Sequence, residues 1–455
     1  MASNEEIPAI YLKSLYLENF RCFKDEYTIS LTDKQGKPAQ WTVFLGNNNT
    51  GKTSILKAIA NLEVKERVVT DSEEKKLYNN HTRYQPRYSS KGEVWNKDFL
   101  IGIDIFISSA FKGNISKNTY FELKTYKNPI HFIGERKAYG NISIKNNTYS
   151  LTAASISSNN EKIDFQKIYP LFKIYGYGTS RKSSASNNIN SSELFDTTIG
   201  LFSDTQFLLN VEEWLLQLDY ATKNNAANAK KVFSKVKSIL TSEILPDIND
   251  IRFRTTKDFQ NFLEIKTDYG WVKFRDLGYG YQTTIAWLAD LAKRMFDRYP
   301  ELENPLHGPA IVLIDEIDLH LHPEWQRKII KYLSDLFPNT QFIVTAHSPL
   351  IVQSAENVNL VMLEKDEATG SINVRQQFGS FQGWTVEEIL RELMDLGEKT
   401  RSDRYLELMR EFEDSLLEEN YAGAKTAYEE LDKILSPSSH QRKVLQIQMS
   451  SLIPA

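Results

Sequence analysis

The feature that most constrains this chain is the loop Gly46–Thr53, whose sequence is GNNNTGKT. It follows the apolar run Trp41–Leu45 and precedes a stretch from Ser54 in which apolar residues recur at helical spacing, so the pattern predicts a strand, a glycine-rich loop and a helix. The glycines allow backbone N–H groups to converge on a phosphate, and the helix start adds its positive dipole end. This context disfavours a chance match.

The residues of this loop have distinct expected roles in binding ATP. In this pattern the lysine reaches the β- and γ-phosphates, and the threonine hydroxyl is a ligand of Mg²⁺. Lys52 and Thr53 are therefore the expected phosphate and metal contacts, and ATP and Mg²⁺ are the expected cofactors. The predicted ATP-binding residues of the loop are Gly46, Asn47, Asn48, Asn49, Thr50, Gly51, Lys52 and Thr53.

Two carboxylates follow a second apolar run, Ile311–Ile314. An unbroken apolar run is typical of a strand that a parallel sheet buries on both faces, and open α/β sheets bind ligands at the carboxyl ends of such strands. We predict that Asp315 holds the hydrated Mg²⁺ and that Glu316 orients or deprotonates the attacking water. The alternative, an acidic helix cap, fits poorly with the four preceding β-type residues.

A histidine follows the next predicted strand, Gln341–Thr345. His347 lies 31 residues beyond Glu316, and its ring can donate a hydrogen bond to a γ-phosphate. An isolated histidine is more often structural than functional, but its place directly after a strand favours a role in the same site.

A second glycine-bearing segment, Leu277–Gln282, precedes an apolar-faced helix. Two glycines at a helix start form another anion-binding surface. Since one nucleotide does not need two phosphate cradles, we predict that this segment closes on the nucleotide of a partner subunit. The alternative is a simple glycine-rich helix entry. The residues concerned are Gly278, Tyr279, Gly280, Tyr281 and Gln282.

In their order along the chain, the four elements resemble the ABC-type ATPase head of transporters, SMC-like repair proteins and OLD-like ATPases of bacterial defence. The resemblance identifies Gly46–Thr53 as Walker A, Asp315 and Glu316 as Walker B, Leu277–Gln282 as the signature and His347 as the switch histidine. It implies an ATPase that forms ADP and phosphate, with Glu316 and His347 as catalytic residues, and a homodimer, or a higher oligomer of dimers, joined through the nucleotide sites.

Further residues resemble the stand-alone ATPases of anti-phage defence, most of all the Septu group. Asp318 corresponds to the D-loop, which crosses the dimer interface in such heads, and the run Leu321–Pro323 is similar to that subgroup. Arg21 corresponds to the turn near the adenine. The partner that this resemblance implies is a separate nuclease of the HNH type.

Two positions depart from the pattern of the ABC-type head. Gly278 stands where the signature serine is expected, so a hydroxyl contact to the γ-phosphate is lost and slow hydrolysis is expected. The glutamine that usually links the two lobes has no clear counterpart, although Arg181 and Gly178 lie in roughly the corresponding region.

The expected fold is an α/β ABC-type head over residues 8–365, with an inserted antiparallel β region at about 67–156 and a helical lobe at about 195–250. Residues 366–455 are expected to form acidic helices for assembly or partner docking. Between Glu387 and Asp432 there are 15 acidic and 6 basic residues, a net charge of −9 against −4 for the whole chain, which leaves +5 elsewhere.

Composition excludes several function classes. The net charge of −4 disfavours a generally cationic nucleic-acid binder, and the single cysteine excludes a Cys-based metal site. The sequence contains no run of 18 apolar residues, so no membrane-spanning helix is predicted. Only 95 residues follow Leu360, and they are predicted helical, which leaves no nuclease domain. We therefore expect a cytoplasmic ATPase that regulates a separate effector nuclease. The alternative is an SMC-like DNA-repair or chromosome-associated ATPase that clamps nucleic acid directly.

Overall fold

The structure is a computed structural model, and it describes residues 9–61, 173–183, 197–204, 208–243, 245–395, 397 and 400–452, together with the backbone of nine strands between 64 and 164. The chain divides into two compact units, residues 1–384 and 385–455, which are described separately. None of the described helices is long and apolar enough to cross a membrane.

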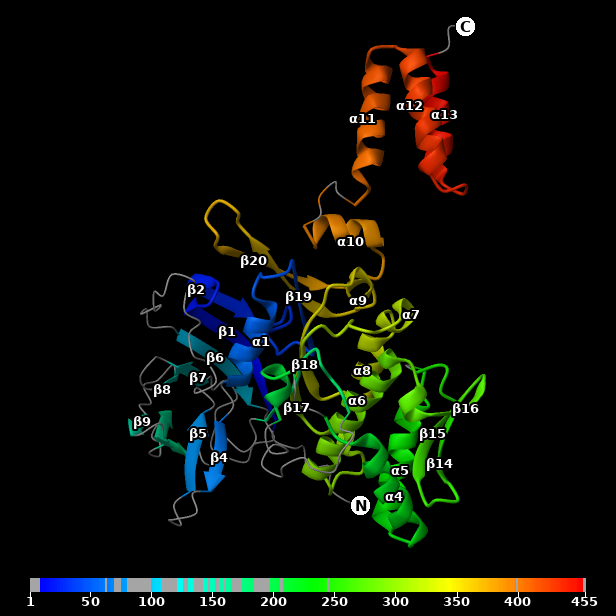
Figure 1. Cartoon of the computed structure of the whole chain (residues 1–455). Coiled ribbons are helices and arrows are strands. Elements are labelled where there is room, and N and C mark those ends of the chain that lie inside the picture. The colour runs from blue at the N-terminus through cyan, green and yellow to red at the C-terminus, as the bar shows by residue number, and fades with distance from the viewer. Residues whose placement is uncertain are drawn as a thin grey trace. The chain divides into compact units, whose positions relative to one another are not determined.

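The first unit is built on a six-stranded sheet (Figure 1). Neighbouring strands are parallel except for the last pair, which is antiparallel. The strands, in sheet order, are β13 (Ile174–Tyr177), β17 (Ala310–Ile314), β18 (Thr340–Thr345), β3 (Trp41–Gly46), β19 (Val358–Lys365) and β20 (Ile372–Gly379). Every residue of β17 and β18 is buried, because both faces of the sheet are covered.

Different elements cover the two faces of this sheet (Figure 1). On one face, Leu313 and Ile343 belong to the same apolar cluster as Ile55 and Ile59 of α1 (Lys52–Asn61). On the other face, α8 (Ile329–Leu336) places Ser334 within a 2.8 Å hydrogen bond of the Trp41 indole N–H. The carboxyl ends of β3, β17 and β18 therefore meet at one edge.

A second, antiparallel sheet packs on the α1 side, in the order β2-β1-β6-β7-β8. Its strands are β1 (Ile10–Phe20), β2 (Phe23–Ser30), β6 (Leu100–Ile107), β7 (Phe121–Thr125) and β8 (Ile130–Gly134). Within the region expected as inserted β structure at 67–156, the described strands pair antiparallel, and β6 pairs with β1 along eight positions. The side chains of that region lie outside the described residues.

Three hairpins complete the strands of this region. They are β4–β5 (Val64–Val68 and Lys75–Asn79), β9–β10 (Ile142–Lys145 and Thr148–Leu151) and β11–β12 (Ser155–Ser158 and Glu161–Asp164).

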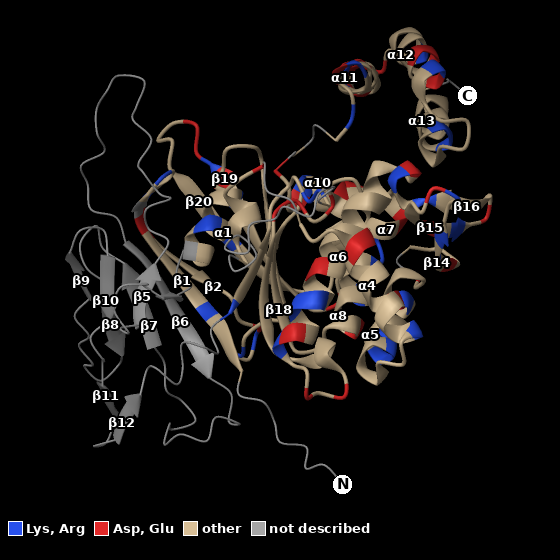
Figure 2. Cartoon of the chain, turned by 60° about the horizontal axis from the view of Figure 1, so that its bottom comes forward, with Lys and Arg blue, Asp and Glu red and all other residues tan. Residues whose placement is uncertain are grey.

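The helical lobe expected at 195–250 contains α4 (Val211–Lys223) and α5 (Ala227–Leu240). Asn210 caps α4 by accepting a hydrogen bond from the Glu213 N–H. Lysines gather on α5, which carries four of them and no acidic residue (Figure 2). The lobe continues beyond 250 through β14 (Asp250–Thr255), β15 (Asn261–Thr267), β16 (Gly270–Lys273) and the long helix α6 (Tyr279–Arg298).

A buried polar cluster joins α6 to the core sheet. The Tyr177 hydroxyl at the end of β13 donates to Asp290 Oδ2 at 2.9 Å, and Arg294 Nε donates to the same oxygen at 2.6 Å. Burial, and the neighbouring Asp290 carboxylate, hold the pKa of Tyr177 well above its ordinary value, so the phenol stays a donor. The cluster therefore fixes the helix that begins with the glycine-bearing segment to the sheet.

The second unit comprises α10 (Val386–Glu392), α11 (Asp403–Leu417), α12 (Tyr421–Ile434) and α13 (His440–Ser450). The unit begins at residue 385, because β20, which lies beyond residue 366, pairs with β19 over eight positions and belongs to the core sheet. The apolar stripe Leu408, Phe412 and Leu416 packs among α11, α12 and α13. It is therefore the core of this small unit.

Candidate nucleotide-binding site

The phosphate loop connects β3 to α1 in a backbone conformation that requires its glycines. Gly46 and Gly51 have φ values of 147° and 99°, in the region that disfavours side chains. A Cβ on Gly46 would lie 2.4 Å from the Leu363 carbonyl oxygen, and one on Gly51 would lie 2.5 Å from Cys22 Sγ. Asn49 also has a positive φ of 67°, which asparagine tolerates better than most residues. The loop is thus a tight backbone curve between sheet and helix.

Lys52 lies against the backbone of this curve. Its Nζ donates to the carbonyls of Gly46 at 2.6 Å and Asn47 at 2.9 Å, and the side chain is buried. Burial lowers the pKa of Lys52, while three neighbouring carboxylates, led by Asp315, oppose that shift. The site therefore combines a buried ammonium with carboxylates that favour its charged form.

Asp315 joins three chain segments at the end of β17. The Thr53 hydroxyl of α1 donates to Asp315 Oδ2 at 2.8 Å, and the Thr345 hydroxyl of β18 donates to Oδ1 at 2.7 Å. Mg²⁺ beside a nucleotide is held by one or two protein oxygens, with phosphates and waters completing its shell. The Thr53–Asp315 pair fits that requirement. Among the described residues no cluster of three or more acidic, His or Cys side chains offers an all-protein metal site.

Glu316 and His347 lie side by side. Glu316 Oε1 is 3.8 Å from His347 Nε2, and about a third of each side chain is exposed (34% and 37%). The backbone N–H of Glu316 donates to the Thr345 hydroxyl at 2.6 Å, and Glu316 has a left-handed φ of 50°. A carboxylate that is open to water and fixed through its own backbone has the placement expected of a general base.

Asp318 connects the loop after β17 to the segment after β18. Its carboxylate accepts from the backbone N–H of His347, at 3.1 and 3.2 Å. Gln326 Nε2 adds a bond to the Asp318 carbonyl at 3.2 Å, and Gln326 Oε1 accepts from the Ser348 hydroxyl at 2.6 Å. Both polar contacts set the position of His347 relative to the loop after β17.

The glycine-bearing segment packs against this same loop. Gly280 approaches it so closely that a Cβ would lie 2.3 Å from the His320 carbonyl oxygen, and the Tyr279 ring meets His320 edge-on at 4.7 Å. Tyr281 lies edge-on to Trp325 at 4.5 Å, and Gln282 Nε2 donates to the Leu277 carbonyl at 2.7 Å. Gly278, by contrast, has open space, since a Cβ there would meet only the Tyr281 ring at 3.9 Å.

Arg21 lies at the start of α1. It occupies the turn between β1 and β2 with a φ of 56°, and its Nη1 donates to Ser54 Oγ at 3.0 Å. The structure thus brings Arg21 to the phosphate loop, together with the carboxylates and His347. In the described part of the chain, no hydrogen bond joins residues 278–282 to residues 46–53, and the two cradles remain separate within one chain.

Two residues of the site were without a role in the sequence analysis. Thr345 bonds both Asp315 and Glu316, and a hydroxyl at the last position of a buried strand was the available signal. Arg181 donates to the carbonyls of Asp315 and Glu316, a contact across 134 and 135 residues that no local motif indicates.

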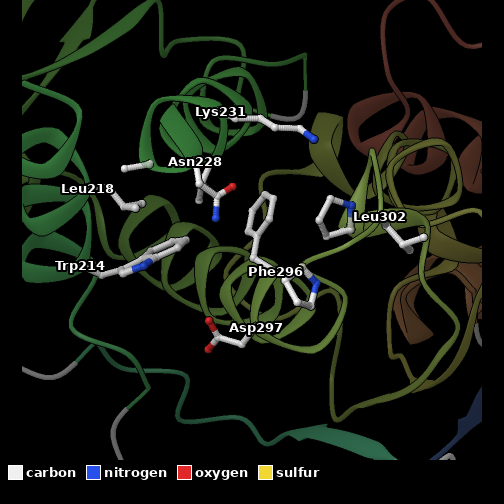
Figure 3. A pocket seen from close by; sticks show the side chains of 11 residues that line it. Trp214, Leu218, Asn228, Lys231, Phe296, Asp297 and Leu302 are labelled. Carbon is white, nitrogen blue, oxygen red and sulfur yellow. The ribbon is translucent and has the colours of Figure 1, made fainter. Parts of the chain in front are cut away.

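A separate cavity of about 470 Å³ lies in the helical lobe (Figure 3). Its wall includes Trp214 of α4, Lys231 of α5 and Phe296 of α6. None of its lining residues belongs to the predicted site, so the cavity is not the nucleotide pocket.

Together, the glycine-dependent loop, the buried lysine and the threonine–carboxylate pair define a phosphate-loop nucleotide-binding domain. Residues 11–352 match the model of the AAA ATPase domain family, and the chain belongs to that family. The expected fold class, an α/β head with a parallel sheet, antiparallel strands and helices, is confirmed.

Relatives with known names include defence-system proteins. The chain is 27% identical over 453 residues to the retron Ec83 probable ATPase of Escherichia coli, an alignment that covers 90% of this chain and 80% of that protein. It is 41% identical over 208 residues to the Septu protein PtuA of Bacillus thuringiensis, covering 44% of this chain and 52% of the relative. The match therefore spans about half the length of that Septu relative. These similarities confirm the predicted resemblance to phosphate-loop ATPases of the defence type.

Among solved structures, the Smc head domain of Pyrococcus furiosus, bound to the C-terminal domain of ScpA, aligns with a TM-score of 0.44 and 13% identity. The alignment covers 82% of this chain and 97% of that one.

Proposed function

We propose that this protein binds ATP with Mg²⁺, hydrolyses it slowly to ADP and phosphate, and closes head to head with a second copy to control a separate nuclease in anti-phage defence. One observation carries the proposal. A single carboxylate, Asp315, holds hydroxyls from both neighbouring segments, and Glu316 follows it directly beside His347. Relatives named as retron ATPases and Septu PtuA support the setting in defence.

Binding rests on the phosphate loop and the Thr53–Asp315 pair. The loop's converging N–H groups and the Lys52 ammonium neutralise phosphate charge, and the start of α1 adds its dipole. Thr53 and Asp315 would hold Mg²⁺, which would supply neutralisation of the phosphate charge. Because loop, helix and strand are fixed to one another, the residues that contact phosphate are preorganised.

Hydrolysis is assigned to Glu316. Its carboxylate accepts a proton from the attacking water, and His347 donates a hydrogen bond to the γ-phosphate region from the neighbouring strand end. The bond between Asp318 and the His347 backbone keeps the two catalytic side chains in a fixed relation. Water reaches the site because Glu316 is about one-third exposed (34%).

A second subunit supplies the missing side of the pocket. The glycine-bearing start of α6 lies against loop Ile317–His322 and makes no hydrogen bond to its own phosphate loop in the described residues. We assign it to the γ-phosphate of a partner copy, with Asp318 near the interface. Gly278 has no hydroxyl to offer there, which makes turnover slow.

The effector nuclease is assigned to a separate chain of the HNH type. An HNH nuclease needs a His-bearing metal constellation, and no such cluster occurs among the described residues. The second unit, α10–α13, is the proposed docking module. Since Leu408 and Phe412 form its internal core, docking falls to exposed apolar side chains, which include Leu417, Ile434 and Ile447. ATP occupancy then shifts the population of bound and released nuclease.

The experiment that tests this function measures phosphate release and DNA cleavage by the purified chain. We expect Mg²⁺-dependent ATP turnover and no DNA cleavage, and we expect cleavage only after a neighbour-encoded nuclease is added. A form lacking residues 385–455 should keep ATP binding and lose the nuclease. Robust DNA cleavage by the chain alone would contradict the assignment, and absence of ATP turnover would contradict the enzymatic part.

A further inference from the structure

Arg181 follows β13, at the buried edge of the nucleotide site. Only 6% of the residue is exposed. Its Nε donates to the Gly178 carbonyl at 2.8 Å, and its Nη2 donates to the carbonyls of Asp315 and, at 2.5 Å, Glu316. One guanidinium thus ties the turn after β13 to the two residues that carry the metal and water chemistry.

The acceptors are unusual for a buried arginine, which normally pairs with a carboxylate. Burial lowers the pKa of Arg181 to about 10, and the carboxylates of Asp315, Asp318 and Glu316 oppose the shift from a distance. The guanidinium therefore remains protonated at neutral pH. Its planar fork of donors lets one side chain bind several carbonyls, which a lysine ammonium on a flexible stem does less well.

Arg181 binds the backbone that sets the direction of the Glu316 side chain. Glu316 has a φ of 50°, a conformation that non-glycine residues rarely adopt unless their surroundings impose it. Arg181 binds its carbonyl and Thr345 binds its N–H, so both peptide groups of Glu316 are fixed. Its carboxylate consequently lies beside His347.

The geometry points to Arg181 as a positioning residue that sets the direction of the Glu316 carboxylate by holding its backbone, without touching nucleotide. This inference rests on the proposed ATP hydrolysis, and it assigns Arg181 to the turnover step rather than to nucleotide affinity. The planar arrangement of the guanidinium donors, and not the charge alone, holds the Glu316 backbone.

The test compares Arg181→Lys and Arg181→Met with wild type by steady-state kinetics and by binding of a fluorescent ATP analogue. We expect kcat to fall about 10- to 100-fold in both variants, since small misplacements of catalytic groups cost this much, with KM and Kd changed less than about threefold. Arg181→Lys keeps the charge and should not restore turnover.

Arg252→Lys is the matched control, because Arg252 also bonds through its guanidinium, to Glu264, but stands on β14 and outside the nucleotide site. It should keep kcat within about twofold. Wild-type kcat in Arg181→Lys, or a loss confined to KM and Kd, would overturn the inference. If the Met variant fails to fold, the Lys variant alone decides.

The failure of the proposed function is a different result, namely a wild-type protein without ATP turnover. The placement of Glu316 is then read directly by hydrogen–deuterium exchange of peptides covering residues 313–320. Faster exchange there in Arg181→Lys, and not in Arg252→Lys, supports the positioning role. Unchanged exchange in Arg181→Lys overturns it.

Discussion

Two helix starts in this molecule carry glycines. They differ in how many of the groups expected to bind phosphate are already held in place. At α1, the glycines have φ values of 147° and 99° and admit no side chain, and Lys52 and Thr53 are already engaged by neighbouring groups. At α6, Gly278 has an ordinary φ of −57°, open space around it and no side-chain cap. One phosphate cradle is therefore preformed within the chain, whereas the other presents an open helix start. Under the proposed function, another copy completes the second cradle.

The largest effect is expected from Glu316→Gln. The amide cannot accept the proton of the attacking water, and general-base catalysis contributes about 10²- to 10⁴-fold, so turnover should fall by that factor. ATP binding should be retained. Phosphate release and equilibrium binding measure the two quantities separately. Glu324→Gln, at an exposed glutamate paired with Lys328, is the control and should leave turnover unchanged. Normal turnover in Glu316→Gln would show that another group is the base.

Lys52→Ala should break the preformed cradle. Loss of a hydrogen bond to a charged group costs about 1.5–3 kcal/mol, so Kd for ATP should rise roughly 10- to 100-fold. Isothermal titration with ATP and Mg²⁺ measures it. Lys57→Ala removes a lysine from the same helix and should change Kd less than about threefold. An equal increase of Kd in the two variants would show that Lys52 contributes only its positive charge.

Gly280→Ala and Gly278→Ala place the same methyl group at two positions of one helix start. At Gly280 the methyl would lie 2.3 Å from the His320 carbonyl and displace the loop that carries Glu316 and Asp318, so kcat should fall about 10- to 100-fold. At Gly278 the methyl has room, and kcat should remain within about threefold. Similar kcat values for the two variants would show that the close contact between α6 and the loop has no role in turnover.

Gly278→Ser is the smallest expected change. It introduces the hydroxyl that the resemblance expected, into space that the structure leaves open. Turnover should not be abolished, and any change should be a modest increase of up to about threefold, because serine supplies the missing hydroxyl. A steady-state assay at saturating ATP measures this. Loss of turnover would indicate that catalysis requires a residue without a side chain at position 278.

Local motifs singled out most of the residues that lie together at the candidate site, because each motif fixes its own backbone. The phosphate loop, the carboxylates after Ile314 and His347 after Thr345 all depend on a strand ending at a known residue. The role of Arg181 could not be predicted, since it binds main-chain carbonyls more than 130 residues away.

The fold was predictable to a similar degree. Alternation indicated antiparallel strands before residue 156, but pairing of β6 with β1 depends on long-range register. The stripe at Leu408 and Phe412 showed a helix face, while its partners, α12 and α13, are set only by packing.

The central claim is that the phosphate loop of one subunit works with the signature of another. It is tested by mixing two variants, Lys52→Ala and Gly278→Asp, at an ATP concentration well below the raised Kd of Lys52→Ala. The aspartate has room in its own chain and should repel the phosphates of a partner's nucleotide. A mixed dimer contains one intact composite site, so random pairing should restore about a quarter of wild-type turnover. Turnover of the mixture no greater than the average of the separate variants would contradict the claim.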